Sequence, residues 1–266
     1  MKLITSKKLL KFKNINHGFF NKNGGVSKGI YKSLNCGSGS KDRKKSVNKN
    51  LEIVRRKIGK KAQKIFLVNQ IHSGKFLYLN KNRNLIKKKI KADAIITNQK
   101  RLPIAVLTAD CVPLLLYDSK EEIIAAIHAG WKGAFKGIIN NVIKFMLKKG
   151  CKTKNITVSI GPCIGQKNYN VGEDFKNKFI KKHKKNKIFF KNVDNLIYFN
   201  LPDYVKSQLK LNKINKIDML NIDTYNIKNN FFSARRSLKL KHADYGRNIS
   251  IIMTVSYTHL TLPTRS

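Results

Sequence analysis

The segment IIAAIHAGWKGAFKGIINNVIKFMLKKG, residues 123–150, joins an apolar run, a glycine-rich turn and an amphipathic stretch. Ile123–Ile127 has the length and composition of a strand that is buried on both faces. After the turn, apolar residues recur on one side of a predicted helix that closes at Gly150: Phe135, Ile138, Ile139, Val142, Met146 and Leu147. This order predicts an α/β fold, and the turn at Gly130 and Gly133 would direct backbone N–H groups at an anion.

Further apolar segments of strand length lie on both sides of this unit. We expect strands at Ile65–Val68, Phe76–Leu79, Ala94–Thr97, Ile104–Leu107, Pro113–Tyr117, Ile156–Ile160 and Ile249–Met253. A helix is expected over residues 44–57, with Gly59 closing it, and two more between residues 173 and 220. With no internal repeat and no long linker, the sequence predicts a single α/β domain with mixed β-sheets flanked by helices.

Three metal-ligand side chains lie beside small, turn-forming residues. They are His72 in QIHSG, Cys111 in TADC and His128 in HAGWKG, separated by 39 and 17 residues. Zinc accepts two imidazoles and a thiolate readily, and three protein ligands leave one position open for chemistry. Alone, His72 is more often a surface or hydrogen-bonded residue and Cys111 a small buried one, whereas His128, at the end of an apolar strand beside glycines, is more suggestive of a site. Structural zinc sites use close ligand pairs, so the wide spacing favours a catalytic metal.

Four other residues near these segments each allow two interpretations. Asp110 either serves as an acid or base beside Cys111 or caps a turn. Arg235 and Arg236 either clamp a phosphate or form structural ion pairs. Trp131 either stacks on a base or packs in the core. The zinc deaminase pattern of H-x-E with P-C-x-x-C is absent, because Ala129-Gly130 follows His128 and Gly165 ends Pro162–Gly165.

The formal net charge of +42 raises the possibility of a nucleic-acid partner. The lysines are spread along the chain, including runs at 87–89 and 181–187, and only nine of the 56 basic residues are arginine. Lys, Asn and Ile share A/T-rich codons, so genome composition explains the excess of lysine. We therefore expect weak binding to polyanions and no specific nucleic-acid partner.

Four unpaired cysteines, the lack of a signal sequence and the lack of a membrane-length apolar run predict a cytoplasmic protein with no membrane partner. The chain ends VSYTHLTLPTRS, and residues 255–260 back-translate to a common sequencing-adapter end. We therefore expect residues 1–254 to form the catalytic domain and residues 255–266 to be non-native. His259 is for this reason not counted as a ligand.

Ordered motifs along the chain resemble the YfiH-type laccase-domain family, formerly labelled polyphenol oxidase or multicopper laccase-like and associated with purine nucleoside phosphorylase activity. The matching segments are GGVSKGIYKSLN (24–35), NQIHSG (69–74), ADAIIT (92–97), LTADCVPLLLYD (107–118), AAIHAGWKG (125–133), IGPCIG (160–165), YNVGEDF (169–175) and FFSARR (231–236) with GRNISII (246–252). Two positions differ: Asn21-Lys22-Asn23 replaces a common Thr-Arg, and Ala234 replaces a common aromatic residue.

This resemblance implies a cysteine hydrolase-like (CNF/YfiH-like) fold and zinc on His72, Cys111 and His128. It also implies phosphorolysis of adenosine, inosine, guanosine and S-methyl-5'-thioadenosine, with adenosine deamination as a side activity. The candidate catalytic residues are Asp110 and Cys111. The candidate substrate- or phosphate-binding residues are Asn35, Gly130, Gly133, Arg235 and Arg236.

Two alternatives remain open. Cys111 would be the nucleophile of a hydrolase with His72 or His128 as its base. A copper-dependent polyphenol oxidase would need several copper ions, for which six histidines in the chain are few. Monomer and homodimer are both compatible with the sequence.

Overall fold

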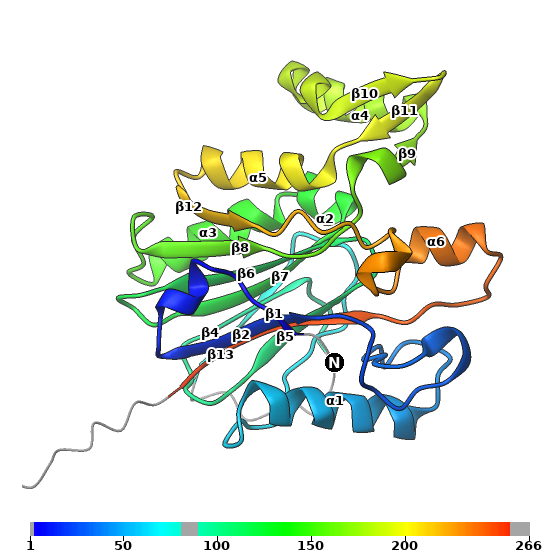
Figure 1. Ribbon diagram of the computed structural model, residues 1–266. Helices are drawn as coiled ribbons and strands as arrows, with labels where there is room; N and C mark the ends of the chain where they lie inside the picture. Colours follow the sequence, from blue (N-terminus) through cyan, green and yellow to red (C-terminus); the bar gives the residue numbers. More distant parts are fainter. Residues whose placement is uncertain (1–2, 81–89, 256–266) are drawn as a thin grey trace, which may run out of the picture.

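A six-stranded mixed sheet forms the centre of the molecule (Figure 1). The computed structural model describes residues 3–80 and 90–255. In their order across the sheet, the strands are β12 (Lys216–Met219), β8 (Ile156–Ile160), β6 (Val112–Asp118), β7 (Ile124–Ala129), β4 (Ala94–Thr97) and β3 (Phe76–Leu79). The pairs β12–β8 and β3–β4 are parallel, and the other pairs are antiparallel. The central strands β6 and β7 are buried throughout, as their apolar sequences predict.

A second, antiparallel sheet packs against one face of the first. Its strands, in order, are β1 (Leu3–Ile4), β2 (Ile15–Phe20), β13 (Asn248–Thr254) and β5 (Ile104–Thr108). Ile95 and Leu115 from the six-stranded sheet join Val106 and Ile252 in the apolar layer between the sheets. Strands β5 and β6 follow one another in sequence but belong to different sheets. The turn that contains Cys111 therefore carries the chain from one sheet to the other.

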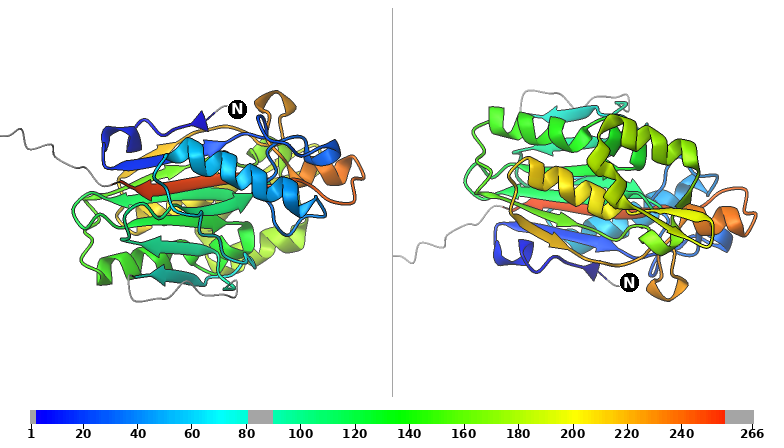
Figure 2. Two further views of the ribbon diagram at one scale, coloured as in Figure 1. Left: turned by 90° about the horizontal axis from the view of Figure 1, so that it is seen from below. Right: turned by 90° about the horizontal axis from the view of Figure 1, so that it is seen from above.

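Helices cover the two outer faces and give four layers in all (Figure 2). α1 (Lys44–Ile58) lies on the four-stranded sheet, where Val54 and Ile58 pack with Ile251. α2 (Trp131–Phe135), α3 (Ile138–Lys148) and α5 (Leu201–Leu211) lie on the six-stranded sheet. These layers confirm the predicted α/β architecture of mixed sheets flanked by helices.

A small three-stranded sheet stands at one end of the helical layer, at the top of Figure 1. Its strands, in order, are β10 (Phe190–Val193), β11 (Leu196–Phe199) and β9 (Asn170–Val171), with α4 (Glu173–Lys182) beside them and α6 (Ala234–Lys239) below. Short 3-10 helices occur at η1 (Leu9–Lys11), η2 (Gly29–Tyr31), η3 (Gln166–Asn168), η4 (Lys184–Phe189) and η5 (Ile227–Asn229). Trp131 packs on Phe175 at 4.9 Å between ring centroids, which supports the core-packing interpretation of this tryptophan.

Three local predictions need correction. The helix expected after the turn is two helices, because Gly137 adopts a left-handed φ of 83° between α2 and α3. Ile65–Val68 is not a strand; only Phe66 forms an isolated bridge, to Ile104. β7 continues to Ala129, so His128 lies within the strand rather than after it.

Two sequence features fall outside the described residues: the lysines at 87–89 and the tail 256–266 with His259. Within residues 3–80 and 90–255, no helix combines the length and the apolar character that crossing a membrane requires.

His17 in β2 gives the fold a pH dependence. Its side chain is buried, and its Nε2 accepts the backbone N–H of Ser6 at 2.9 Å. Burial lowers the pKa of His17 to about 4, although the charge of Asp218 acts in the opposite direction. The unfolded chain, with its ordinary pKa of 6.5, takes up the proton first as the pH falls. The stability due to neutral His17 is therefore complete above pH 6.5 and is lost towards pH 4.

We predict that the wild-type protein loses about 2 kcal/mol more unfolding free energy between pH 7 and pH 5 than His17→Gln does. The glutamine keeps a hydrogen-bond acceptor and does not titrate. Urea denaturation of both proteins at the two pH values measures the difference. Equal losses in the two proteins would contradict the assignment to His17.

Candidate metal centre and its pocket

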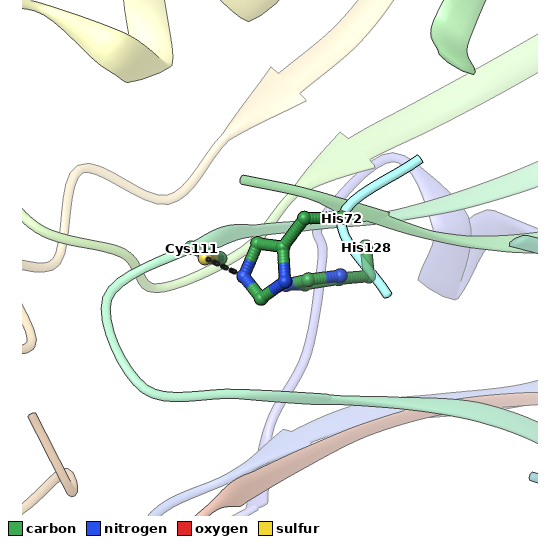
Figure 3. A group of neighbouring side chains, drawn as sticks. All are labelled: His72, Cys111 and His128. Atoms are coloured by element: carbon green, nitrogen blue, oxygen red, sulfur yellow. Dashed lines mark hydrogen bonds between the residues drawn. The ribbon is translucent and has the colours of Figure 1, made fainter. Parts of the chain in front are cut away.

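His72, Cys111 and His128 meet at one end of the six-stranded sheet (Figure 3). Their ligand atoms all lie within 4.8 Å of one another. Cys111 Sγ is 3.8 Å from His72 Nε2, and the two imidazole rings are 4.7 Å apart in an edge-to-face arrangement. His72 comes from the loop before β3, Cys111 from the turn between β5 and β6, and His128 from β7. The fold thus brings together the three ligands that the sequence predicts.

Asp93 holds this cluster in place through hydrogen bonds, and its role was not predicted from the sequence. Its Oδ1 lies 2.9 Å from His128 Nδ1 and accepts the backbone N–H groups of Ile71 and His72. Its Oδ2 accepts the N–H and the hydroxyl of Ser73. One buried carboxylate therefore fixes the ring of one ligand and the loop of another, and leaves His128 Nε2 as the free ring nitrogen. The available signal was a rare acid, one of 14, inside the ADAIIT segment.

Electrostatics favour the ionised thiol. Burial opposes ionisation of Cys111, but the neighbouring His128 and His72 outweigh it and lower the pKa of the thiol to about 6. Burial also opposes protonation of His128, yet Cys111 and Asp93 raise its pKa. Because a metal binds thiolate and neutral imidazole, it would displace the proton that His128 holds in the metal-free state.

Gly130, which follows β7 and precedes α2, leaves room for the cluster. A Cβ at this position would lie 2.8 Å from both Cys111 Sγ and His72 Cδ2. Its φ of −69° is open to any residue, so the requirement for glycine is steric. The two imidazoles and the thiolate are close enough to bind one ion, and Gly130 leaves space beside them. This set of donors fits a small cation such as zinc.

A pocket of about 670 Å³ opens beside Cys111. Asp110 and Cys111 belong to its lining, together with Tyr169 and Asn170 from the start of the three-stranded sheet and Arg235 from α6. The metal cluster therefore lies next to a space of the size that small organic substrates need.

Asp110 connects the Cys111 turn to the segments that precede α6. Its φ is 85°, and its carboxylate accepts the hydroxyls of Thr224 and Ser233 and the backbone N–H of Arg235. Burial raises the pKa of Asp110, although these hydrogen bonds and the charge of Arg236 oppose the shift. The three donors and the positive φ thus give Asp110 a positional role between the Cys111 turn and α6.

A family model described as multi-copper polyphenol oxidoreductase laccase matches residues 16–255. The chain belongs to this family.

Relatives in the laccase-like family carry the name purine nucleoside phosphorylase. The Rickettsia prowazekii protein of that name is 38% identical over 185 residues, which are 68% of this chain and 74% of the relative. The Haemophilus influenzae protein of that name is 34% identical over 228 residues, 84% of this chain and 90% of the relative.

A solved structure of the same family confirms the fold. The Bacillus licheniformis hypothetical protein YfiH superposes with a TM-score of 0.82 at 26% identity, covering 90% of this chain and 92% of that one. The resemblance to YfiH-type proteins expected from the sequence motifs is thereby confirmed.

The two arginines expected at the site of this laccase-like protein have different surroundings. Arg236 directs its guanidinium at the carbonyl oxygens of Thr224, Tyr225 and Phe231. Arg235 lines the pocket and makes one side-chain hydrogen bond, to Asn170 Oδ1 at 2.9 Å. Arg235 is therefore the arginine with donors available to a ligand.

Asn35 and Gly133 serve packing in this structure. Asn35 is fully buried, donates to Ser40 and Asp42, and accepts the N–H groups of Gly37 and Arg247. A Cβ on Gly133 would lie 3.1 Å from the carbonyl oxygen of Ser73, so this glycine lets α2 pack on the His72 loop. Neither residue lines the pocket, and we leave both, with Arg236, out of the proposed binding site.

We predict that Gly130→Ala weakens zinc binding by about tenfold or more, because the added methyl group displaces Cys111 or His72. Gly172→Ala is the matched control, since Gly172 also precedes a helix in extended conformation and an added Cβ there meets nothing within 4 Å. Competition with a chromophoric chelator measures the affinities. Wild-type zinc affinity in Gly130→Ala would refute the steric argument.

A second prediction concerns Asp93→Asn, which keeps the shape of the side chain. An asparagine amide accepts hydrogen bonds only through its oxygen, so either His128 or the Ser73 loop loses its acceptor. Zinc affinity should therefore fall about 10- to 100-fold. The exposed Asp174→Asn in α4 removes one negative charge without touching the cluster. If the two variants bind zinc equally well, Asp93 does not position the ligands.

Proposed function

We propose that this protein is a zinc-dependent purine nucleoside phosphorylase. It would convert adenosine, inosine, guanosine or S-methyl-5'-thioadenosine and phosphate into the free base and the corresponding sugar 1-phosphate. The observation that carries this proposal is the His72–Cys111–His128 cluster at the wall of a pocket that also contains Arg235. The names of the relatives support the same reaction.

His72, Cys111 and His128 would hold the zinc ion, and Asp93 would keep His128 in the tautomer whose Nε2 is free for the metal. Bound there, zinc would supply a Lewis acid with an open coordination position that orients a substrate oxygen.

Arg235 would bind phosphate. Its guanidinium has several donors left after its bond to Asn170, and bidentate N–H donation suits a phosphate anion. None of the ion pairs among the described residues involves this arginine, so its charge is available to the anion.

Asp110 would protonate the departing purine. It lines the pocket next to Cys111, and burial raises its pKa, which favours the protonated form that this step requires. As the bond from the sugar to the purine breaks, the sugar would carry the developing positive charge. An oxygen of the phosphate held by Arg235 would then attack the anomeric carbon and form the sugar 1-phosphate. Deamination of adenosine is the accompanying side activity that we propose; in it, water would attack C6 of the base and ammonia would leave, with the glycosidic bond intact.

One specific observation favours a second candidate, a cysteine hydrolase without metal. Cys111, His128 and Asp93 form a chain in which Asp93 contacts His128 Nδ1 and His128 raises the thiolate fraction of Cys111. This order matches a nucleophile, a base and an orienting acid. A copper-dependent polyphenol oxidase is a weaker candidate, because the described residues contain one cluster of three metal ligands and the reaction needs several copper ions.

Metal analysis combined with a phosphate-dependent assay tests the proposal. We predict about one zinc per wild-type chain, ribose 1-phosphate release from adenosine, and loss of both in Cys111→Ala, with activity at least about 100-fold lower. Cys151→Ala, a buried cysteine outside the cluster, is the matched control.

Three results would contradict the zinc phosphorylase. They are full activity of the metal-free protein, phosphate-independent turnover with a trapped acyl-Cys111 intermediate, and copper-dependent phenol oxidation. The second result would support the hydrolase, and the third would support the oxidase.

A further inference from the structure

Tyr169 lies in the pocket wall between η3 and β9 and belongs to none of the predicted site residues. Its backbone is fixed, since its N–H donates to Gln166 and its carbonyl accepts the N–H of Phe199. The ring therefore has a defined position beside Cys111 and Arg235, and the question is which part of it is available to a ligand.

A cation and two aromatic rings lie next to the Tyr169 ring. The Arg235 guanidinium carbon lies 5.2 Å from the ring centroid. Phe199 and Phe175 approach the ring with centroids at 6.0 and 6.5 Å and interplanar angles near 60°: 59° and 63°. The guanidinium of Arg235 therefore lies over one face of the Tyr169 ring and is held close to the rest of that side chain.

The hydroxyl of Tyr169 remains available. Its oxygen has no hydrogen-bond partner among the described residues, and it is not buried away from solvent. Burial, followed by the negative charge of Cys111, raises the pKa of this phenol, so it stays protonated and can donate. A neutral donor thus faces the pocket next to a guanidinium with unused N–H groups.

We propose that Tyr169 is a specificity-determining residue that donates a hydrogen bond to the phosphate anion held by Arg235. Asn170 fixes the guanidinium over the ring, so one phosphate can accept from Arg235 and from the hydroxyl at the same time. This inference rests on the proposed function for its role in catalysis, while the phosphate-binding contact itself is independent of turnover.

Calorimetric titration with inorganic phosphate, on the full-length zinc-loaded protein, tests the contact directly. Tyr169→Phe keeps the ring and removes only the hydroxyl, and phosphate should bind at least about tenfold more weakly. Tyr198→Phe is the matched control, because Tyr198 lies in β11 opposite Asn170 and lines the same pocket. Its phosphate affinity should stay within about twofold of wild type, and zinc content and melting temperature should be unchanged in both variants.

Steady-state kinetics provide the second readout. In Tyr169→Phe the KM for phosphate should rise about tenfold, while the KM for adenosine and the phosphate-independent deamination stay close to wild type. Equal phosphate affinity in wild type and Tyr169→Phe overturns the inference, and so does the absence of phosphate binding to the wild type. If phosphate binds, weakens in Tyr169→Phe, and no nucleoside is cleaved, the contact is supported and the proposed phosphorylase fails.

Discussion

The buried carboxylate of Asp93 is the constraint on which the site depends. It immediately precedes β4, and its backbone carbonyl accepts the N–H of His128, so the register of β4 against β7 places it under that ligand. Burial opposes its ionisation, but hydrogen bonds from His128 and Ser73 outweigh this and lower its pKa to about 2. The buried negative charge of Asp93 therefore orients the His128 ring through one oxygen and the loop of Ser73 through the other.

The two-sheet architecture explains why the cluster lies at an edge that a substrate can reach. The chain leaves the four-stranded sheet at Thr108 and enters the six-stranded sheet at Val112, and the turn between them places Cys111, which is partly buried, in the lining of the pocket. Gly130 keeps the start of α2 from filling the space beside that turn. The small sheet and α6 contribute further residues to the lining, so the pocket is made from segments distant in sequence.

Apolar patterning was a good guide to the elements of this fold. The buried runs of β6, β7 and β8 and the amphipathic periods of α1 and α3 lie where the sequence indicates. Patterning failed where a single backbone angle decides, as at Gly137, and where a segment is buried without pairing along its length, as at Ile65–Val68. In neither case does side-chain hydrophobicity report the backbone conformation.

The sequence by itself determined the candidate ligand set, because His72, Cys111 and His128 are identified by chemical type and by the small residues around them. Only the tertiary structure decided which polar residues serve these ligands. Asp93 contacts Ser73 across 20 residues of sequence, and Arg235 beside the cluster contacts Asn170 across 65. Arg235 and Arg236 are adjacent in sequence and point to different surroundings. The direction of a side chain is set by packing across the fold, so it cannot be predicted from composition and spacing alone.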